Sequence, residues 1–185
     1  MDLSTPRNVI DFWTGAGPKA WFRADPAFDA AMRARFEATH LAASRNELED
    51  WSPSSEGSLA LVLLLDQAPR NIYRGSAHAF ATDGLAQAVA ARAIDAGFDQ
   101  AAPADLQVFF YLPFEHAENA AAQQRSLALF EAHATRTGDP DYLRYARVHA
   151  DVIGRFGRFP HRNLALGRTT TPDEAAFLAK GGFRG

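Results

Sequence analysis

The sequence predicts an all-α fold: a single-domain helical bundle of about seven or eight antiparallel helices over residues 1–185. Three observations support this prediction. Alanine is abundant and β-branched residues are sparse, a composition that favours helices over strands. Capping residues followed by proline recur along the chain, as they do where helices begin. Apolar residues between these starts recur at the helical period.

Helix starts are the clearest local signals. A capping side chain precedes a proline at Thr5-Pro6, Asp25-Pro26, Asp139-Pro140 and Thr171-Pro172. Glu174 follows the last of these at the third helical position, which completes a capping box. The apolar spacing then predicts helices over residues 6–13, 26–43, 56–67, 77–96, 103–111, 119–137, 140–156 and 172–179.

Apolar stripes justify the longer helices one by one. They consist of Phe28, Met32 and Phe36 on the second, Leu85, Val89 and Ile94 on the fourth, Leu127, Phe130 and Ala134 on the sixth, and Tyr142, Tyr145, Val152 and Phe156 on the seventh. The third helix contains LALVLLL (59–65), which is apolar on every side and predicts a central buried helix. A buried strand is the competing interpretation, but the leucine content favours a helix. Gly97 and Gly138 are expected to end helices.

The composition excludes several classes of protein. With 47% apolar and 22% charged residues, the chain is of ordinary globular type, and its net charge of -3 gives no overall case for nucleic-acid or membrane binding. The absence of cysteine excludes disulfides and Cys-type zinc sites. The first residues lack the pattern of a signal peptide, and no apolar run approaches the roughly 20 residues of a membrane span. We therefore expect a soluble cytoplasmic protein, either a monomer or a homodimer.

Three polar segments interrupt the helical pattern: DQAPRNIYRG (66–75), YLPFEHAEN (111–119) and RFGRFPHRN (155–163). Asp66 is predicted near a helix C-terminus, where the helix dipole disfavours a carboxylate, so Arg70 or Arg74 should lie beside it. The first and third segments both place Arg-Asn just after a proline. Because arginine and carboxylate groups often form bidentate pairs, we expect these donors to meet Asp66, Glu115 and Glu118 in one polar cluster at three helix ends.

These segments also carry a resemblance to a known family. The chain resembles the bacterial family called domain of unknown function 924 in VIDFWTGAG (9–17), AWFRADPAFD (20–29), LLLDQAPRNIYRGSAHAFATD (63–83), VFFYLPFEHAEN (108–119) and HADVIGRFGRFPHRNLALGR (149–168), then in TPDEAAFL near the end. The resemblance implies a helical bundle similar to tetratricopeptide repeats and brings no established activity. Members usually have phenylalanine where Ala68 stands and serine where Ala117 stands. A hydroxyl nucleophile beside His116 is therefore excluded in this chain.

Three functional interpretations of the polar cluster remain open. The first is a small acidic ligand, a carboxylate or phosphate, anchored by Arg70 and Arg162. Its expected binding residues are Asp66, Gln67, Arg70, Asn71, Arg74, Glu115, Arg158, His161, Arg162 and Asn163. The second is a hydrolase, metal-assisted or not, with His116 and Glu118 as the catalytic acid–base pair. The third is a purely structural cluster in a helical protein–protein interaction module.

Metal, cofactor and nucleic-acid binding are not among the main predictions. One such interpretation is that His116 with Glu115 and Glu118, plus His149 or His161, binds zinc or iron or activates water. Against it, EHAE is not a recognised spacing of metal ligands on a regular helix, and His149 lies on the aromatic stripe of its own helix, which is typical of a core histidine. No Gly-rich phosphate loop and no G-x-S-x-G elbow is present in the sequence. RFGRF interleaves arginine with aromatic residues as single-stranded nucleic-acid sites do, but the acidic chain argues against that use. Whether the protein is an enzyme stays open at this point.

Overall fold

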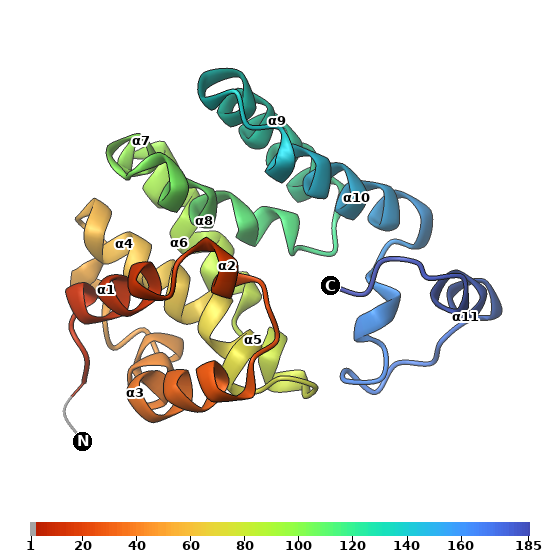
Figure 1. Ribbon diagram of the computed structural model, residues 1–185, viewed down its shortest axis with the longest axis horizontal. Coiled ribbons are helices and arrows are strands. Elements are labelled where there is room, and N and C mark those ends of the chain that lie inside the picture. Colours follow the sequence, from red (N-terminus) through yellow and green to blue (C-terminus); the bar gives the residue numbers. More distant parts are fainter. Residues whose placement is uncertain (1–2) are drawn as a thin grey trace. The chain divides into compact units, whose positions relative to one another are not determined.

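A computed structural model describes residues 3–185, and this part of the chain is all-α, as predicted, with eight helices of seven or more residues and no β-strand. The chain divides into two compact units, residues 1–113 and 114–185 (Figure 1). The single domain expected over residues 1–185 stays a prediction. None of the helices in the described part is long and apolar enough to cross a membrane.

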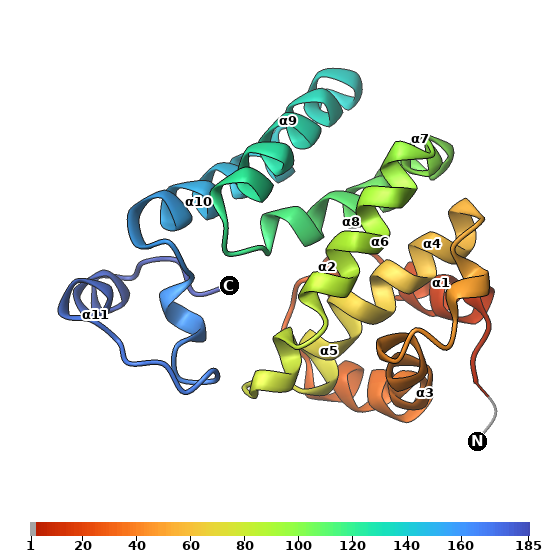
Figure 2. The ribbon, with the colours of Figure 1, turned by 180° about the vertical axis from the view of Figure 1, so that it is seen from behind.

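The first unit is built from short and long helices that pack in pairs. Its helices are α1 (Pro6–Ala16), α2 (Pro18–Trp21), α3 (Pro26–Ser44), α4 (Ser55–Val62), α5 (Ala68–Ile72), α6 (Asp83–Asp95), α7 (Phe98–Ala101) and α8 (Ala104–Glu115), the last of which ends in the second unit. Helix α4 packs against both α1 and α6, and α3 packs against α5 (Figure 2). Short 3₁₀ turns cover Glu49–Trp51 and Ala77–Phe80.

The second unit centres on one antiparallel helix pair. Helices α9 (Ala120–Thr137) and α10 (Asp141–Phe156) lie side by side (Figure 1). A 3₁₀ turn over Pro160–Arg162 follows, and it contacts the last helix, α11 (Pro172–Ala179). The RFGRFPHRN segment thus covers the end of α10 and the 3₁₀ turn.

Most predicted helix starts and stops are confirmed, but the start at Asp139-Pro140 is wrong: α10 begins at Asp141, and Pro140 stands at its N-cap without a side-chain cap. The side chains of Thr5, Asp25 and Thr171 cap α1, α3 and α11, and Thr171 forms its capping box with Glu174. Gly138 adopts the left-handed conformation that ends α9, with φ of 77°. These boundaries are set by neighbouring residues, which is why the sequence shows them.

The apolar run 59–65 is buried as predicted, with every residue at most 4% exposed. The helix does not stop at Pro69, however. A π-helical turn covers Leu63–Gln67, in which the Ala68 N–H donates to the Leu63 carbonyl, and α5 follows directly. The predicted helix end is therefore wrong at this point, and the chain stays helical through the proline.

Side chains from elsewhere in the first unit explain why the chain can continue. Proline has no N–H to donate, so a turn of helical carbonyls before Pro69 needs other donors. His40 Nδ1 lies 2.8 Å from the carbonyl oxygen of Leu64, and Thr82 Oγ1 donates to that of Leu65 at 2.6 Å. These two contacts replace backbone hydrogen bonds inside the core.

Two other predicted boundaries are also wrong. The helix expected over 77–96 is split, because Thr82, whose hydroxyl is bound to Leu65, lies between the 3₁₀ turn Ala77–Phe80 and α6. The helix expected to end at residue 111 continues to Glu115 with Pro113 inside it. Residues 109–112 are at most 4% exposed, so their burial outweighs the hydrogen bond that an internal proline removes.

Candidate acid–base site

Asp66 in the first unit is paired with Arg70, as predicted. The carboxylate is fully buried, and Arg70 Nη1 lies 3.4 Å from its Oδ1 and donates to the Asp66 backbone carbonyl at 2.7 Å. Arg70 also forms a bidentate pair with Asp83, at 2.8 and 3.1 Å. Burial by itself would lower the pKa of Arg70, but the two carboxylates outweigh it and raise that pKa.

The other predicted residues of segment 66–75 also have partners inside the first unit. Gln67 donates to the Asp66 carboxylate at 2.6 Å, and Asn71 donates to the Gln67 carbonyl at 3.0 Å. Arg74 forms a bidentate pair with Asp29, at 2.8 and 2.9 Å. The carboxylates of Asp29 and Asp83 were missed by the sequence analysis. No local pattern connects them to their arginines, which lie 45 and 13 residues away.

Segment 155–163 in the second unit is held by what we call the arginine network: Arg158, Glu174, Asn163, Arg168 and Glu118. Arg158 donates twice to Glu174, at 2.6 and 2.9 Å, and Asn163 donates to the same carboxylate at 3.1 Å. Arg168 donates twice to Glu118, at 2.6 and 3.1 Å, and once to the Asn163 side chain at 3.0 Å. The network is a continuous chain of charge-assisted hydrogen bonds.

Both carboxylates of the arginine network are held in the ionised form. The Arg158 guanidinium is the main cause that lowers the pKa of Glu174 to about 2. Burial would raise the pKa of Glu118, but hydrogen bonds from Arg168 and from the Phe159 N–H outweigh it, and the pKa is lowered. An ionised, fully engaged carboxylate suits a structural acceptor better than a proton donor. The acid–base pair of His116 with Glu118 stays a prediction.

A different group of residues in the second unit has the geometry of an acid–base site. Glu115 ends α8, His116 follows it, and His149 lies on α10. One ring nitrogen of each histidine and one oxygen of Glu115 all lie within 4.8 Å of one another. Glu115 and His149 are 3% and 8% exposed, and His116 is half-buried. We call these three residues the imidazole–carboxylate cluster.

His149 is oriented by two acceptors. Its Nδ1 lies 2.9 Å from the Tyr145 carbonyl oxygen and 3.1 Å from Glu115 Oε1. Because a carbonyl can only accept, Nδ1 carries the proton and Nε2 carries the lone pair of the neutral ring. Burial, followed by the nearby His116, lowers the pKa of His149 to about 3. The sequence analysis read His149 as a core histidine and missed its contact with Glu115, which comes from another helix.

Aromatic rings and a guanidinium surround this cluster. The ring centroids of Phe183 and Phe159 lie 4.4 and 5.5 Å from that of His149. Burial, and next the guanidinium of Arg162, lowers the pKa of His161 to about 4. Arg162 is 6% exposed, and its guanidinium lies 4.5 Å from the Phe159 ring centroid. The surroundings are therefore apolar and carry positive charge.

Comparison with known proteins is informative about the family and the fold. A family model described as bacterial protein of unknown function (DUF924) matches residues 9–182. The chain belongs to this family. It is also similar to a solved structure of a protein of unknown function from Agrobacterium tumefaciens, with 51% sequence identity and a TM-score of 0.90 over 95% of this chain and 97% of that chain. No curated protein is significantly similar to the sequence.

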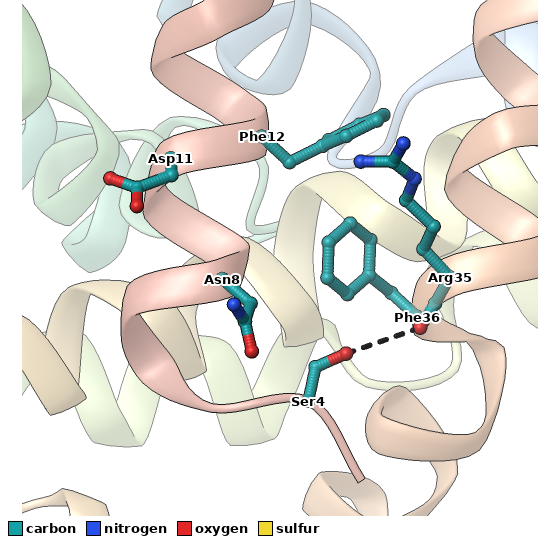
Figure 3. Close-up of a pocket in the computed structure, with 6 residues that line it drawn as sticks. All are labelled: Ser4, Asn8, Asp11, Phe12, Arg35 and Phe36. Atoms are coloured by element: carbon teal, nitrogen blue, oxygen red, sulfur yellow. Dashed lines mark hydrogen bonds between the residues drawn. The ribbon is translucent and has the colours of Figure 1, made fainter. Parts of the chain in front are cut away.

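A pocket of about 420 Å³ in this DUF924 protein lies between α1 and α3 (Figure 3). Its lining residues are Ser4, Asn8, Asp11, Phe12, Arg35 and Phe36. None of these belongs to the predicted site. Ser4 donates to the Arg35 carbonyl, and the Arg35 guanidinium lies 5.1 Å from the Phe12 ring centroid. These residues of the pocket lining therefore already interact with one another.

The predicted site residues of this DUF924 protein thus fall into three groups. Those of segment 66–75 form ion pairs and hydrogen bonds inside the first unit. Those of the arginine network fix the loop after α10. Those near His149 form the imidazole–carboxylate cluster. That all three segments share one site stays a prediction, because segment 66–75 and the other two groups belong to different units.

Proposed function

We propose that the protein is an enzyme that binds a small acidic substrate and hydrolyses it with a water molecule activated at the imidazole–carboxylate cluster. The observation that carries the proposal is the orientation of His149. The Tyr145 carbonyl and Glu115 hold its Nδ1–H, so the lone pair of Nε2 is available to a reacting group. An imidazole oriented by a carboxylate is the arrangement that activates nucleophiles in many unrelated hydrolases. The lowered pKa of His149 keeps the ring neutral at pH 7, so Nε2 can accept a proton, and makes it a weaker base than an ordinary histidine.

His116 gives the cluster a second imidazole. The two ring centroids are 6.1 Å apart, so both rings can reach one small substrate. Hydrolysis needs a group that activates water and a group that donates a proton to the departing oxygen. Water would give a proton to His149 as its oxygen bonds to the carbonyl or phosphoryl centre. His116 would donate a proton to the leaving oxygen as its bond to that centre breaks, so that the group departs as an alcohol.

The preference for an acidic substrate follows from the charge around the cluster. The guanidinium of Arg162 is among the causes that lower the pKa of His161, so its positive charge acts on this part of the second unit. A buried positive charge favours an anion because the surrounding protein screens it weakly. Arg70, the other predicted anchor, forms a bidentate pair with Asp83, for which a ligand would have to compete. Arg162 is the predicted anchor whose charge acts on His149 in the second unit.

Hydrolysis of small p-nitrophenyl esters and phosphates tests this function. We expect the wild type to turn over at least one phosphate or carboxylate substrate of such a panel, and Glu115→Gln to reduce that rate by roughly 100-fold or more, the range of general acid–base contributions. Glu131→Gln, an exposed change on α9, is the control and should leave the rate unchanged. A folded wild type without activity on the panel, or a fully active Glu115→Gln variant, would refute the proposal.

A protein–protein interaction module is the second candidate function, and one observation favours it. Leu164 directly follows the loop that the arginine network fixes, and it is 94% exposed. A large apolar side chain held in solvent on an ordered loop is typical of a contact residue, although single exposed apolar residues also occur without a function. We expect Leu164→Ser to change the mass in light scattering if a second copy of the chain is the partner. An unchanged mass contradicts that choice of partner.

A further inference from the structure

Glu115, His116 and His149 offer three ligand atoms of the kinds that transition metals prefer. Two are imidazole nitrogens and one is a carboxylate oxygen, all within 4.8 Å of one another. Around a tetrahedral zinc ion, ligands at about 2.0–2.2 Å lie about 3.4 Å apart. Side-chain rotations that move these atoms by about an ångström would therefore bring all three into coordination distance of one ion.

We propose that these three residues bind a divalent transition-metal ion, and we choose zinc as the ion with which to test binding. Three protein ligands of the His₂Glu type leave a fourth position for water or substrate, which is the arrangement of catalytic rather than structural zinc sites. The spacing in the sequence argued against a metal at these residues, and the structure adds that His149 comes to Glu115 and His116 from a different helix. The spacing of Glu115 and His116 alone carries no metal signature.

The contacts behind the ligand atoms support the proposal. Metal-binding histidines almost always donate the second ring N–H to a carbonyl or carboxylate, which fixes the tautomer and the ring orientation. His149 Nδ1 has such a contact with the Tyr145 carbonyl oxygen at 2.9 Å. The rings of Phe159 and Phe183 pack on the same imidazole and provide the apolar shell that surrounds many metal sites.

Charge also fits an ion with an open coordination position. Glu115 is 3% exposed, and a divalent ion would interact strongly with its carboxylate because the surrounding protein screens charge weakly. The neighbouring Arg162 then favours an anion, hydroxide or an acidic substrate group, in the fourth position. If the ion is bound through the Nε2 lone pair of His149, the ion and not the imidazole would activate water, by lowering the pKa of a bound molecule.

This inference rests on the proposed function for the role of the ion, but the binding of the ion can be tested alone. The full chain is stripped with chelator, dialysed, and titrated with Zn²⁺ in a calorimeter. Co²⁺ is added in a parallel experiment as a spectroscopic probe. We expect one tight Zn²⁺ site per chain and a visible cobalt spectrum that Zn²⁺ displaces. No tight site in the folded wild type would overturn the proposal.

Variants identify the ligands. Glu115→Gln keeps the side-chain shape, His116→Ala changes a half-buried residue, and His149→Ala removes the buried imidazole. We expect each of them to weaken Zn²⁺ binding by at least about tenfold. The matched control is His78→Ala, a histidine of the first unit outside the cluster, which should bind Zn²⁺ like the wild type. If His149→Ala does not fold, the first two variants decide, and wild-type affinity in both overturns the proposal.

The two proposals fail in different ways. Zn²⁺ binding that depends on the cluster, without hydrolysis by the zinc-loaded protein, supports the metal site and refutes the hydrolase. Hydrolysis that depends on Glu115, in a folded chain that binds no Zn²⁺ tightly, supports the hydrolase and overturns the metal site. Dependence of both binding and hydrolysis on the cluster supports both proposals.

Discussion

Replacing Glu174 with glutamine should destabilise the second unit by about 3 kcal/mol. Glu174 is 2% exposed and accepts hydrogen bonds from Arg158, Asn163 and the Thr171 N–H. Glutamine keeps the shape but loses the charge and one acceptor. The two bonds from Arg158 are charge-assisted, and such bonds contribute about 1.5–3 kcal/mol each. Because the Arg158 side chain is 29% exposed and can bind water again in the variant, we take the lower value of about 1.5 kcal/mol for each bond, which gives about 3 kcal/mol for the two.

The assay is urea unfolding followed by far-UV circular dichroism. The three tryptophans lie at positions 13, 21 and 51, all in the first unit, so their fluorescence would report mainly on the wrong part of the chain. The control is Asp173→Asn, the exposed neighbour in the same helical turn, which should change the unfolding free energy by about 0.5 kcal/mol or less. A loss below about 1 kcal/mol for Glu174→Gln would refute the claim that this carboxylate holds the loop.

The same variant predicts a pH dependence. The pKa of Glu174 is lowered to about 2 in the folded protein, chiefly by the hydrogen bonds of Arg158, from an ordinary value of 4.5. A lowered pKa means that the folded state prefers the charged form, so the stabilisation is complete above about pH 4.5 and is lost as pH falls towards 2. The difference between wild type and Glu174→Gln should therefore be constant from pH 7 to 5 and shrink below pH 4.5. A difference that stays unchanged at pH 2.5 contradicts this assignment.

Two further predictions concern the first unit. Gly57→Ala should lower the free energy of unfolding in urea by about 1–3 kcal/mol, because the added Cβ would overlap the Trp51 carbonyl. Gly84→Ala, in open space on α6, should raise it by up to about 1 kcal/mol. Equal effects of the two changes would contradict the steric argument. Thr82→Val should cost about 1–3 kcal/mol, because it removes the hydroxyl that donates to the Leu65 carbonyl in the core. A neutral Thr82→Val in the same melt would show that the carbonyl finds another donor.

Local signals explain how much of the fold could be predicted. Thr5, Asp25 and Thr171 cap helices through atoms two or three residues away, so the sequence alone shows them. The π turn before Pro69 is different. It depends on donors from His40 and Thr82, which lie 24 and 17 residues from the carbonyls they bind. No local pattern contains that information, and the helix boundary was misplaced for this reason.

The candidate site depends even more on contacts between residues that are far apart in the sequence. Asp66 and Arg70 are four residues apart on a helix, and the sequence analysis paired them correctly. The partners of Arg74 and Arg158 lie 45 and 16 residues away, so the sequence did not connect these arginines to their carboxylates. In the structure they pair with Asp29 and Glu174. The support for a ligand then comes from the geometry around His149 and not from these two arginines.

Two kinds of polar group in the second unit can be separated on physical grounds. The arginine network engages its carboxylates with bidentate pairs. For Glu174, the buried carboxylate of the network, this pairing avoids the cost of several kcal/mol that an unsatisfied interior charge carries. His149 differs, because its anchored Nδ1–H orients a ring that still carries a lone pair. The network thus accounts for Arg158 of RFGRFPHRN, and it fixes the loop that brings Phe159 against this imidazole. Structural pairing and the proposed chemistry are therefore connected: the network holds the wall of the site, and the cluster acts within it.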